Sequence, residues 1–503
     1  MVVGLSFPVS LGGAGLPAGA LRILVLGAGR SGIGASLTLS GLGLEVTVSD
    51  RRDPESLPGL RDALESGARF LPEGSLAWDW PAPDLVVKSP GVPGEAGPVA
   101  LARERGIPIW SELELAFALF PNPFDAVTGT NGKTTTTALL GHLFETAGRP
   151  AHVLGNIGVA VTSAAGEIRA GEELVVEVSS FQLEDVHSFR PAVGVFLNLT
   201  PDHLDRHGTL ERYLECKAKL FVNQRKGDVA VLNAADPAVA ALGAELAARP
   251  EGPRVALFST AGPSGRSGGP GVDQRSIEQP DLEHRGLERP RLDSWVEGGW
   301  LFLEQERILP VADIRLLGIH NLENCLAAGT AALARGLERD AVAEGLRTFG
   351  GVAHRLEMAG MVRGVTYVND SKATNVEATL TALKAYPTNT HLILGGRDKG
   401  SDYRPVARAC AGACGGVYLI GEATSLIESA FAEVREREGI SGVPDVCLCG
   451  DLEAAVRAAA ARAVPGDVVL LAPACASFDQ YGSFEERGAH FRSLVDRLTG
   501  VDS

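Results

Sequence analysis

Short apolar runs recur along the chain, and segments of helix length separate them. Residues 21–26 predict a buried strand, residues 45–50 predict a second one, and an apolar helix pattern lies between them. Residues 84–87 predict a further strand of the same group. Strands that alternate with helices form parallel sheets, so this region predicts a βαβ unit that ends near Ser111.

Two more groups of strands follow. The second group is predicted at residues 124–128, 174–178 and 193–198, with a helix over residues 133–147 after its first strand. The third group begins after Gly351 and comprises residues 364–369, 391–394, 416–420 and 467–471. The chain is therefore predicted to form three α/β domains in series.

The limits of these domains follow from changes in pattern and composition. Residues 1–20 are rich in Gly and Ala and predict a loose leader, and the three domains are expected at residues 21–111, 112–351 and 352–503. Within the central domain, residues 261–292 are rich in Gly, Pro, Arg, Glu and Ser and show no periodicity. This composition indicates an exposed insertion.

Composition narrows the possible functions. The 503 residues include 46 Lys and Arg and 62 Asp and Glu, giving a net charge of −16. Such a charge disfavours general binding to nucleic acid, and an anionic substrate would need a local basic site. No apolar run is long enough to span a bilayer, so we expect a soluble protein. Seven cysteines without disulfide or zinc-site spacing indicate a reducing, cytoplasmic compartment.

One glycine-rich loop has the pattern of a phosphate-binding site. Between a predicted strand and a predicted helix lie Gly129, Thr130, Asn131, Gly132, Lys133, Thr134 and Thr135. In such loops backbone N–H groups and the helix dipole face an anion, Lys133 adds a cation, and Thr134 offers an oxygen to Mg²⁺. Val127 stands where the usual P-loop has glycine, so the loop is a shorter variant. The loop predicts ATP binding, and the alternative is a glycine-rich turn without a ligand.

The predicted fold is therefore a central P-loop ATPase-like domain, with a mostly parallel sheet, between two Rossmann-like domains. Next to the loop, Glu177 ends a buried strand, and His203 follows the next strand. A buried carboxylate is costly unless it is paired or binds a metal, which favours Mg²⁺ ligation. The alternatives are a capping carboxylate and a structural histidine.

The first glycine loop admits more than one ligand. Gly27, Gly29 and Gly32 satisfy the dinucleotide pattern, and Asp50 is placed to meet a ribose. Taken alone, the motif predicts NAD. Its physical content is a diphosphate near the N-terminus of a helix, so another diphosphate nucleotide satisfies it equally well.

Five segments together resemble those of the Mur ligases, the ATP-dependent amide ligases of peptidoglycan precursor synthesis. They are residues 128–134, 155–158, 177–182, 198–205 and 320–324. In the third domain, further segments resemble the family members that add D-glutamate, and the last two are the most specific. These are residues 354–357, 369–375, 395–400, 474–481 and 484–488. The sequence departs from the family's pattern in the leader, in the insertion and at Arg51 and Arg52.

The resemblance implies ATP and two Mg²⁺ ions, the substrates UDP-N-acetylmuramoyl-L-alanine and D-glutamate, and a monomer. The Gly27 loop then holds the diphosphate of the nucleotide substrate. The implied ATP contacts beyond the loop are Asn156, Asn321, Asn324, Arg355, Asp370 and Lys372. The implied substrate contacts are Gly29, Arg30, Ser31, Gly32, Asp50, Arg51, Gly91, Asn156, Ser179, Gln182, Lys372, Thr374, Lys399, Ser477 and Phe484.

By resemblance, Lys217 lies where the family carries a carbamylated lysine, which would hold a second Mg²⁺ beside Glu177 and His203. Lys219 is the nearby competitor, and an ordinary surface lysine is the alternative. Catalytic roles then fall to Lys133, Glu177, His203 and Lys217.

The implied reaction has two steps. A carboxylate attacks the γ-phosphate of ATP to give an acyl phosphate, and the amine of D-glutamate then displaces phosphate. The third domain must close to bring the amine to the acyl phosphate, so a hinge is expected near Gly350 and Gly351. Three alternatives stay open: a Mur or folylpolyglutamate-synthase-like ligase for another amino acid, an NAD-dependent oxidoreductase, and a nucleotide-binding switch.

Overall fold

The computed structural model describes most of the chain. The described residues are 15–16, 22–75, 82–156, 159–263, 291–316, 318–398 and 400–499. Lys399, most of the predicted leader and residues 264–290 of the predicted insertion lie outside them. Among the described residues, the search for a helix long and apolar enough to cross a membrane finds none.

The N-terminal sheet has five parallel strands in the order β3-β2-β1-β4-β5. Its elements are β1 (Arg22–Leu26), α1 (Arg30–Gly41), β2 (Glu45–Ser49), α2 (Leu60–Glu65), β3 (Arg69–Phe70), β4 (Leu85–Lys88), α3 (Gly97–Glu104), β5 (Ile109–Ser111) and α4 (Glu112–Leu119). The turn after β1 requires glycine, because Gly27 has a φ of 87° and a Cβ on Gly32 would lie 1.8 Å from the Gly27 carbonyl oxygen. This turn sets the start of α1 against the carboxyl end of β1.

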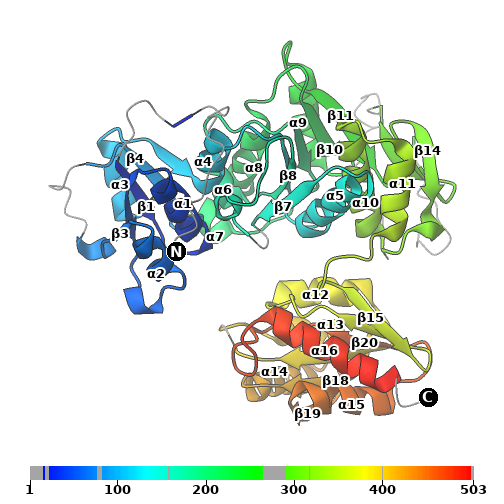
Figure 1. The fold of residues 1–503 in the computed structure, drawn as a ribbon. Coiled ribbons are helices and arrows are strands. Elements are labelled where there is room, and N and C mark those ends of the chain that lie inside the picture. Colours follow the sequence, from blue (N-terminus) through cyan, green and yellow to red (C-terminus); the bar gives the residue numbers. More distant parts are fainter. Residues whose placement is uncertain are drawn as a thin grey trace. The chain divides into compact units, whose positions relative to one another are not determined.

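The central sheet has nine strands in the order β14-β13-β12-β11-β10-β9-β6-β8-β7. The elements of its core are β6 (Phe124–Thr128), α5 (Lys133–Thr146), β7 (Ala151–Gly155), β8 (Glu173–Glu177), α6 (Ser180–Leu183), β9 (Val193–Phe196), α7 (Leu204–His207), α8 (Leu210–Ala218), β10 (Val229–Asn233), α9 (Pro237–Ala247) and β11 (Arg254–Ser259). The remaining elements are β12 (Ser294–Glu297), β13 (Trp300–Leu303), β14 (Glu306–Pro310), α10 (Ile319–Ala334) and α11 (Arg339–Thr348). Strands β6 to β12 pair in parallel, and β13 and β14 are antiparallel. Helices α10 and α11 pack against α5 (Figure 1).

The C-terminal sheet has six strands in the order β15-β16-β20-β17-β18-β19, and only the pairing of β15 with β16 is antiparallel. Its elements are β15 (Glu357–Val362), β16 (Val365–Asn369), α12 (Val376–Ala385), β17 (Thr390–Gly395), α13 (Arg404–Cys410), β18 (Cys414–Ile420), α14 (Thr424–Glu436), β19 (Val446–Gly450), α15 (Leu452–Arg462), β20 (Val468–Leu471) and α16 (Phe484–Thr499). Helix α16, red in Figure 1, packs on β15 and β16.

The predicted fold class, α/β with three mostly parallel sheets, is confirmed. The chain forms two compact units, Met1–Phe349 and Gly350–Ser503, and the first of them holds both the N-terminal and the central sheet. The predicted strand at residues 193–198 is shorter, since β9 ends at Phe196. Strands β7, β10 and β11 and the hairpins of β12 to β14 are not among the predicted strands.

Buried side chains join the N-terminal sheet to the central one. Glu112 accepts hydrogen bonds from the backbone N–H and the hydroxyl of Thr162. Glu114, fully buried, accepts from the backbone N–H groups of His187, Ser188 and Phe189. Because buried acceptors must be satisfied, these contacts fix how the two sheets pack within the first unit.

A buried ionic cluster lies at the amino ends of the neighbouring strands β6 and β8 of the central sheet. Arg335 is 3.1 Å from an oxygen of Asp125 and 2.6 Å from an oxygen of Glu173. Burial raises the pKa of Asp125 to about 7 despite the nearby Arg335 guanidinium. Arg149 also pairs with Glu173, so Asp125 is the carboxylate that depends on Arg335 for its charge balance.

We predict that Arg335→Met lowers the free energy of unfolding of the first unit by about 3 kcal/mol, because it leaves the buried carboxylate of Asp125 without its ion-pair partner. Arg347→Met, which removes an exposed pair with Glu344, should cost less than about 1 kcal/mol. Urea unfolding followed by tryptophan fluorescence measures the difference. All five tryptophans precede Gly350 in the sequence, so the second unit contributes none to the signal: they are Trp78, Trp80, Trp110, Trp295 and Trp300. Equal midpoints for the two variants would contradict the prediction.

Candidate active site

A cavity of about 540 Å³ opens at the carboxyl ends of the N-terminal strands. Eight of the predicted substrate contacts line it: Gly29, Arg30, Ser31, Asp50, Arg51, Gly91, Asn156 and Gln182. Gly32 does not line it, because it packs behind the turn against the Gly27 carbonyl. Ser179 does not line it either. It caps α6, and its backbone N–H and hydroxyl donate to the Gln182 side-chain oxygen.

The carboxylate of Asp50 is already engaged. Arg52 donates two side-chain hydrogen bonds to it, at 3.0 and 2.9 Å, and Ala28 donates a backbone N–H at 2.8 Å. The hydrogen bonds from Arg52 hold the pKa of Asp50 at about 2. Asp50 therefore orders the turn after β1 and the side chain of Arg52. Arg52 lines the cavity together with Arg51, although only Arg51 is among the predicted substrate contacts.

The predicted phosphate loop joins β6 to α5 with backbone geometry that only glycine tolerates. Gly132 precedes the helix with a φ of 83°, and a Cβ there would lie 2.4 Å from the side-chain oxygen of Asn324. The neighbouring loop after β9 holds the loop in place. Asn198 accepts from the backbone N–H of Asn131, and the carbonyl of Thr200 accepts from the Thr130 hydroxyl.

Lys133 lies inside this loop. Its Nζ donates to the carbonyls of Gly129, at 3.0 Å, and Thr130, at 2.8 Å. Asn324 contacts the start of the same helix, where it accepts from the Thr136 hydroxyl, and its amide donates to Asn321. The structure thus brings the predicted residues Asn321 and Asn324 to the phosphate loop.

Glu177 has the surroundings of a cation ligand. It is 3% exposed, one carboxylate oxygen accepts from the Asn156 amide at 2.8 Å, and the other has no hydrogen-bond partner. A bound cation would remove the cost of that buried oxygen. Mg²⁺ in phosphate-transfer sites is typically held by one or two carboxylates together with phosphate oxygens, so Glu177 fits this ion.

His203 follows β9 in a left-handed backbone conformation, with a φ of 53°. Its ring lies 4.8 Å from the ring of Phe181, and its nearest acidic partner is Asp202 at 3.5 Å. Within the described part of the chain, no three His, Cys, Asp or Glu side chains gather around one metal position. A metal between Glu177 and His203 would therefore need ligands from ATP or from a modified lysine.

Lys217, in α8, is 1% exposed. Its Nζ donates to the Gly129 carbonyl at 2.8 Å and lies 4.6 Å from the centre of the Tyr213 ring. Burial, and then the charge of Lys133, hold the pKa of Lys217 well below its ordinary value. Lys217 is therefore buried beside the phosphate loop in surroundings that favour its neutral form, and it is not the surface lysine of the alternative interpretation.

Most of the predicted residues of the second unit follow the carboxyl ends of two neighbouring strands. Asp370, Lys372 and Thr374 follow β16, and Ser477 and Phe484 follow β20, its neighbour in the sheet. Burial raises the pKa of Asp370 to about 6, with Arg355 and Lys372 acting against the shift. Lys399, on the loop after β17, lies outside the described residues.

Arg487 links these loops, and the sequence patterns assign it no role. Its guanidinium is 1% exposed and donates to the hydroxyl and carbonyl of Ser371 and to the carbonyl of Cys475. Ser371 in turn donates to the carbonyl of Phe484. One buried cation thus holds the loops that follow β16 and β20 together.

The sequence is similar to curated enzymes over nearly its full length. The UDP-N-acetylmuramoylalanine–D-glutamate ligase of Pelotomaculum thermopropionicum is 42% identical over 480 residues, which cover 94% of this chain and 97% of that protein. The enzyme of the same name from Acidobacterium capsulatum is 41% identical, with coverages of 94% and 96%. Models of the Mur ligase middle domain and of the Mur ligase glutamate ligase domain match residues 127–332 and 354–475. This chain is a Mur ligase.

Solved Mur ligases share the fold. The UDP-N-acetylmuramate–alanine ligase MurC from Thermotoga maritima has a TM-score of 0.54 at 19% identity, covering 95% of this chain and 99% of that one. MurF from the same organism, solved in complex with ADP, has a TM-score of 0.53 at 17% identity, with coverages of 97% and 100%. The family predicted from the motifs, and with it an ATP-dependent ligase, is confirmed.

In this Mur ligase, Lys133→Ala should weaken ATP binding about 10- to 100-fold, because it removes a charge-assisted hydrogen bond to a phosphate. Isothermal titration calorimetry with ATP measures the effect. Lys226→Ala, which removes an exposed lysine, is the control and should bind ATP like the wild type. Unchanged affinity in Lys133→Ala would remove the phosphate loop from the ATP site.

Proposed function

We propose that this Mur ligase joins D-glutamate to UDP-N-acetylmuramoyl-L-alanine, with cleavage of ATP to ADP and phosphate. The observation that carries the proposal is the similarity, at 42% identity over nearly the whole chain, to an enzyme named for this reaction. The segments after β16 and β20 support it, because Lys372, Thr374 and Ser477 lie on the loops there and Phe484 begins α16, all beyond the carboxyl ends of two neighbouring strands. Lysine and hydroxyl donors suit a dicarboxylate.

The first step transfers the γ-phosphoryl group. An oxygen of the alanyl carboxylate attacks the γ-phosphorus, the bond to the β,γ-bridging oxygen breaks, and ADP leaves. Two anions must approach each other, so Lys133 and the backbone N–H groups of the loop act by neutralising charge. Mg²⁺ held by Glu177, His203 and the Thr134 hydroxyl would supply further positive charge there.

The second step forms the amide. The amine of D-glutamate attacks the acyl carbon, the bond from that carbon to the phosphate oxygen breaks, and the nitrogen loses a proton. The leaving group is inorganic phosphate. The hinge between Phe349 and Gly351 belongs to this proposal, since the two units supply different reactants.

Lys217 is proposed to act as a carbamate. Its neutral amine would attack CO₂, and loss of the nitrogen's proton gives an anion where the chain otherwise has a lysine. Such an anion, close to Glu177 and His203, suits a second Mg²⁺. The chemistry follows from the buried position of Lys217 and the low pKa that results.

We also propose that the enzyme acts as a monomer in the bacterial cytoplasm. All seven cysteines are free, and reduced thiols are the rule in that compartment.

Amino-acid specificity is tested by phosphate release from ATP with Mg²⁺ and UDP-N-acetylmuramoyl-L-alanine. Phosphate should appear with D-glutamate and stay at background with L-glutamate, L-lysine or glycine. The D-glutamyl product, identified by mass spectrometry, confirms amide formation. Release with another amino acid and none with D-glutamate would exclude the proposed specificity.

Lys217→Ala should lose at least about 100-fold in turnover, since removing one charge stabiliser at a phosphoryl-transfer site costs that much. Added formate or acetate should restore part of the rate by replacing the carbamate anion. With ¹³C-labelled bicarbonate, the wild type should show a carbamate resonance that the variant lacks. Lys219→Ala is the matched control and should respond to neither anion. No carbamate resonance and no rescue would leave Lys217 as an unmodified lysine.

A further inference from the structure

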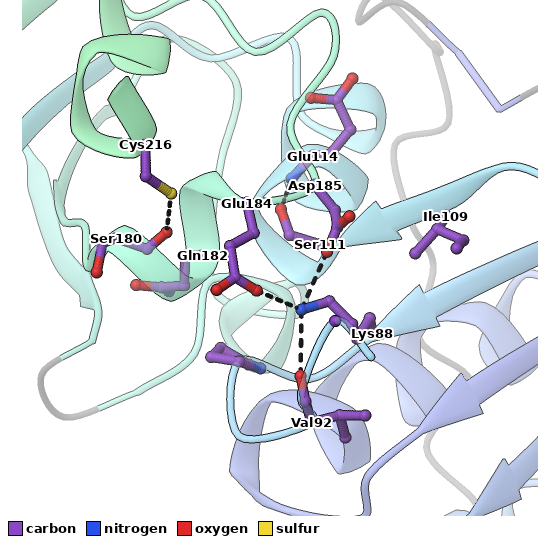
Figure 2. Close-up of polar contacts among 12 residues, drawn as sticks. Lys88, Val92, Ile109, Ser111, Glu114, Ser180, Gln182, Glu184, Asp185 and Cys216 are labelled. Carbon is purple, nitrogen blue, oxygen red and sulfur yellow. Dashed lines mark hydrogen bonds and ion pairs between the residues drawn. The ribbon is translucent and has the colours of Figure 1, made fainter. Parts of the chain in front are cut away.

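A second buried lysine lies at the boundary between the N-terminal and the central sheet. Lys88, the last residue of β4, is 1% exposed. Its Nζ lies 2.8 Å from a carboxylate oxygen of Glu184 and 3.0 Å from one of Asp185 (Figure 2). It also donates to the Val92 carbonyl at 3.2 Å. The predicted ATP and substrate contacts do not include Lys88.

Arg206, in α7, completes the cluster from another direction. Its guanidinium donates to both carboxylate oxygens of Glu184, at 2.8 and 2.5 Å. It also donates to the carbonyls of Pro90, at 3.0 Å, and Val92, at 3.1 Å. The other face of the guanidinium lies 4.3 Å from the centre of the Phe181 ring. Burial opposes ionisation of Glu184, yet the bonds from Arg206 and Lys88 hold its pKa below its ordinary value.

The cluster joins three segments that bear on the site. Residues 90–92 form a wall of the nucleotide cavity. Glu184 stands two residues after Gln182, which lines the same cavity, and Arg206 stands three residues after His203. Lys88 and Arg206 therefore bind the carbonyls of this wall. Both also bind the carboxylate of Glu184, which belongs to the central domain.

Stability alone is a poor explanation for such a cluster. Buried ion pairs stabilise little in comparison with apolar packing, because desolvation offsets their attraction. Such pairs fix the relative orientation of the groups that they join. A guanidinium group that binds one carboxylate and two carbonyls holds all three in a single geometry. Phosphoryl transfer needs such precision, since a misplacement of about 1 Å costs about 100-fold in rate.

We propose that Lys88, Glu184 and Arg206 are positioning residues for the first chemical step. They hold the wall at residues 90–92 against the segments of Gln182 and His203. The cluster thereby sets where the carboxylate end of the nucleotide substrate lies relative to the γ-phosphate. This inference rests on the proposed function.

The test uses the acyl phosphate formed without D-glutamate. Hydroxylamine traps it as a hydroxamate, so the first step is measured alone. In Lys88→Met, trapped hydroxamate should fall at least about 10-fold and the KM for UDP-N-acetylmuramoyl-L-alanine should rise about 10-fold. The KM for ATP should stay within about twofold. Arg206→Lys keeps the charge but loses the fork, and it should show the same split with little loss of thermal stability.

The matched control is Arg335→Met, which breaks a buried ion pair at the amino ends of β6 and β8, away from the phosphate loop at their carboxyl ends. It should lower the unfolding midpoint while leaving both KM values unchanged. If Lys88→Met and Arg206→Lys lose stability in the same way and keep their KM values, the cluster is merely structural and the inference fails.

The affinity for UDP distinguishes a failure of the inference about this cluster from a failure of the proposed function. A wild type that forms no hydroxamate would overturn the proposed function. The inference is then judged by calorimetry with UDP alone: Lys88→Met and Arg206→Lys should bind UDP about 10-fold more weakly than the wild type. An affinity for UDP equal to that of the wild type would overturn the inference. If Lys88→Met does not fold, Arg206→Lys alone is compared with the wild type, and the same outcome decides.

Discussion

The parallel pairing of β6 with β8 and β9 sets the geometry of the site. In this register Val127 lies beside Glu177 and Thr128 beside Phe196. The phosphate loop, the end of β8 and the loop after β9 therefore leave the sheet side by side. Hydrogen bonds from the phosphate loop to Asn198 and Thr200 follow directly from this adjacency. A shift of one residue would turn Glu177 to the other face of the sheet.

Two buried lysines illustrate how partners decide the chemistry of an amine. Lys88 has two carboxylates within 3.0 Å and serves as a fixed cation. Lys217 has a carbonyl as its nearest partner and Lys133 as a charged neighbour, so its neutral form is favoured. The same type of side chain is thus stabilised as a cation at position 88, whereas its neutral form is favoured at position 217.

Much of the fold could be predicted because parallel strands covered on both faces are continuous apolar runs, as at β1, β6 and β17. Strand β7 gives no such signal, since most of its residues are partly exposed. The site residues within motifs could be predicted, because a glycine loop or a strand end places residues that are adjacent in sequence at the same site. The contacts of Lys88 could not be predicted, since Glu184 lies 96 positions along the chain. The hydrogen bond from Arg52 to Asp50 joins residues close in sequence, but the motif does not indicate whether Asp50 binds a ribose or a neighbouring arginine.

An acidic protein whose three proposed reactants are all anions must confine its positive charge. With a net charge of −16, its overall field repels nucleotides and glutamate, so attraction has to arise at short range. The structure shows two ways of doing this. In the phosphate loop, Lys133 donates to two backbone carbonyls, and these two bonds do not neutralise its positive charge. In the second unit, Arg487 also binds carbonyls and a hydroxyl, and it orders loops without consuming the acidic side chains around them. Cations that serve structure are buried in pairs or on carbonyls. Lys133 and the arginines that line the cavity, Arg30, Arg51 and Arg52, lie near the carboxyl ends of strands, where anions are expected to bind.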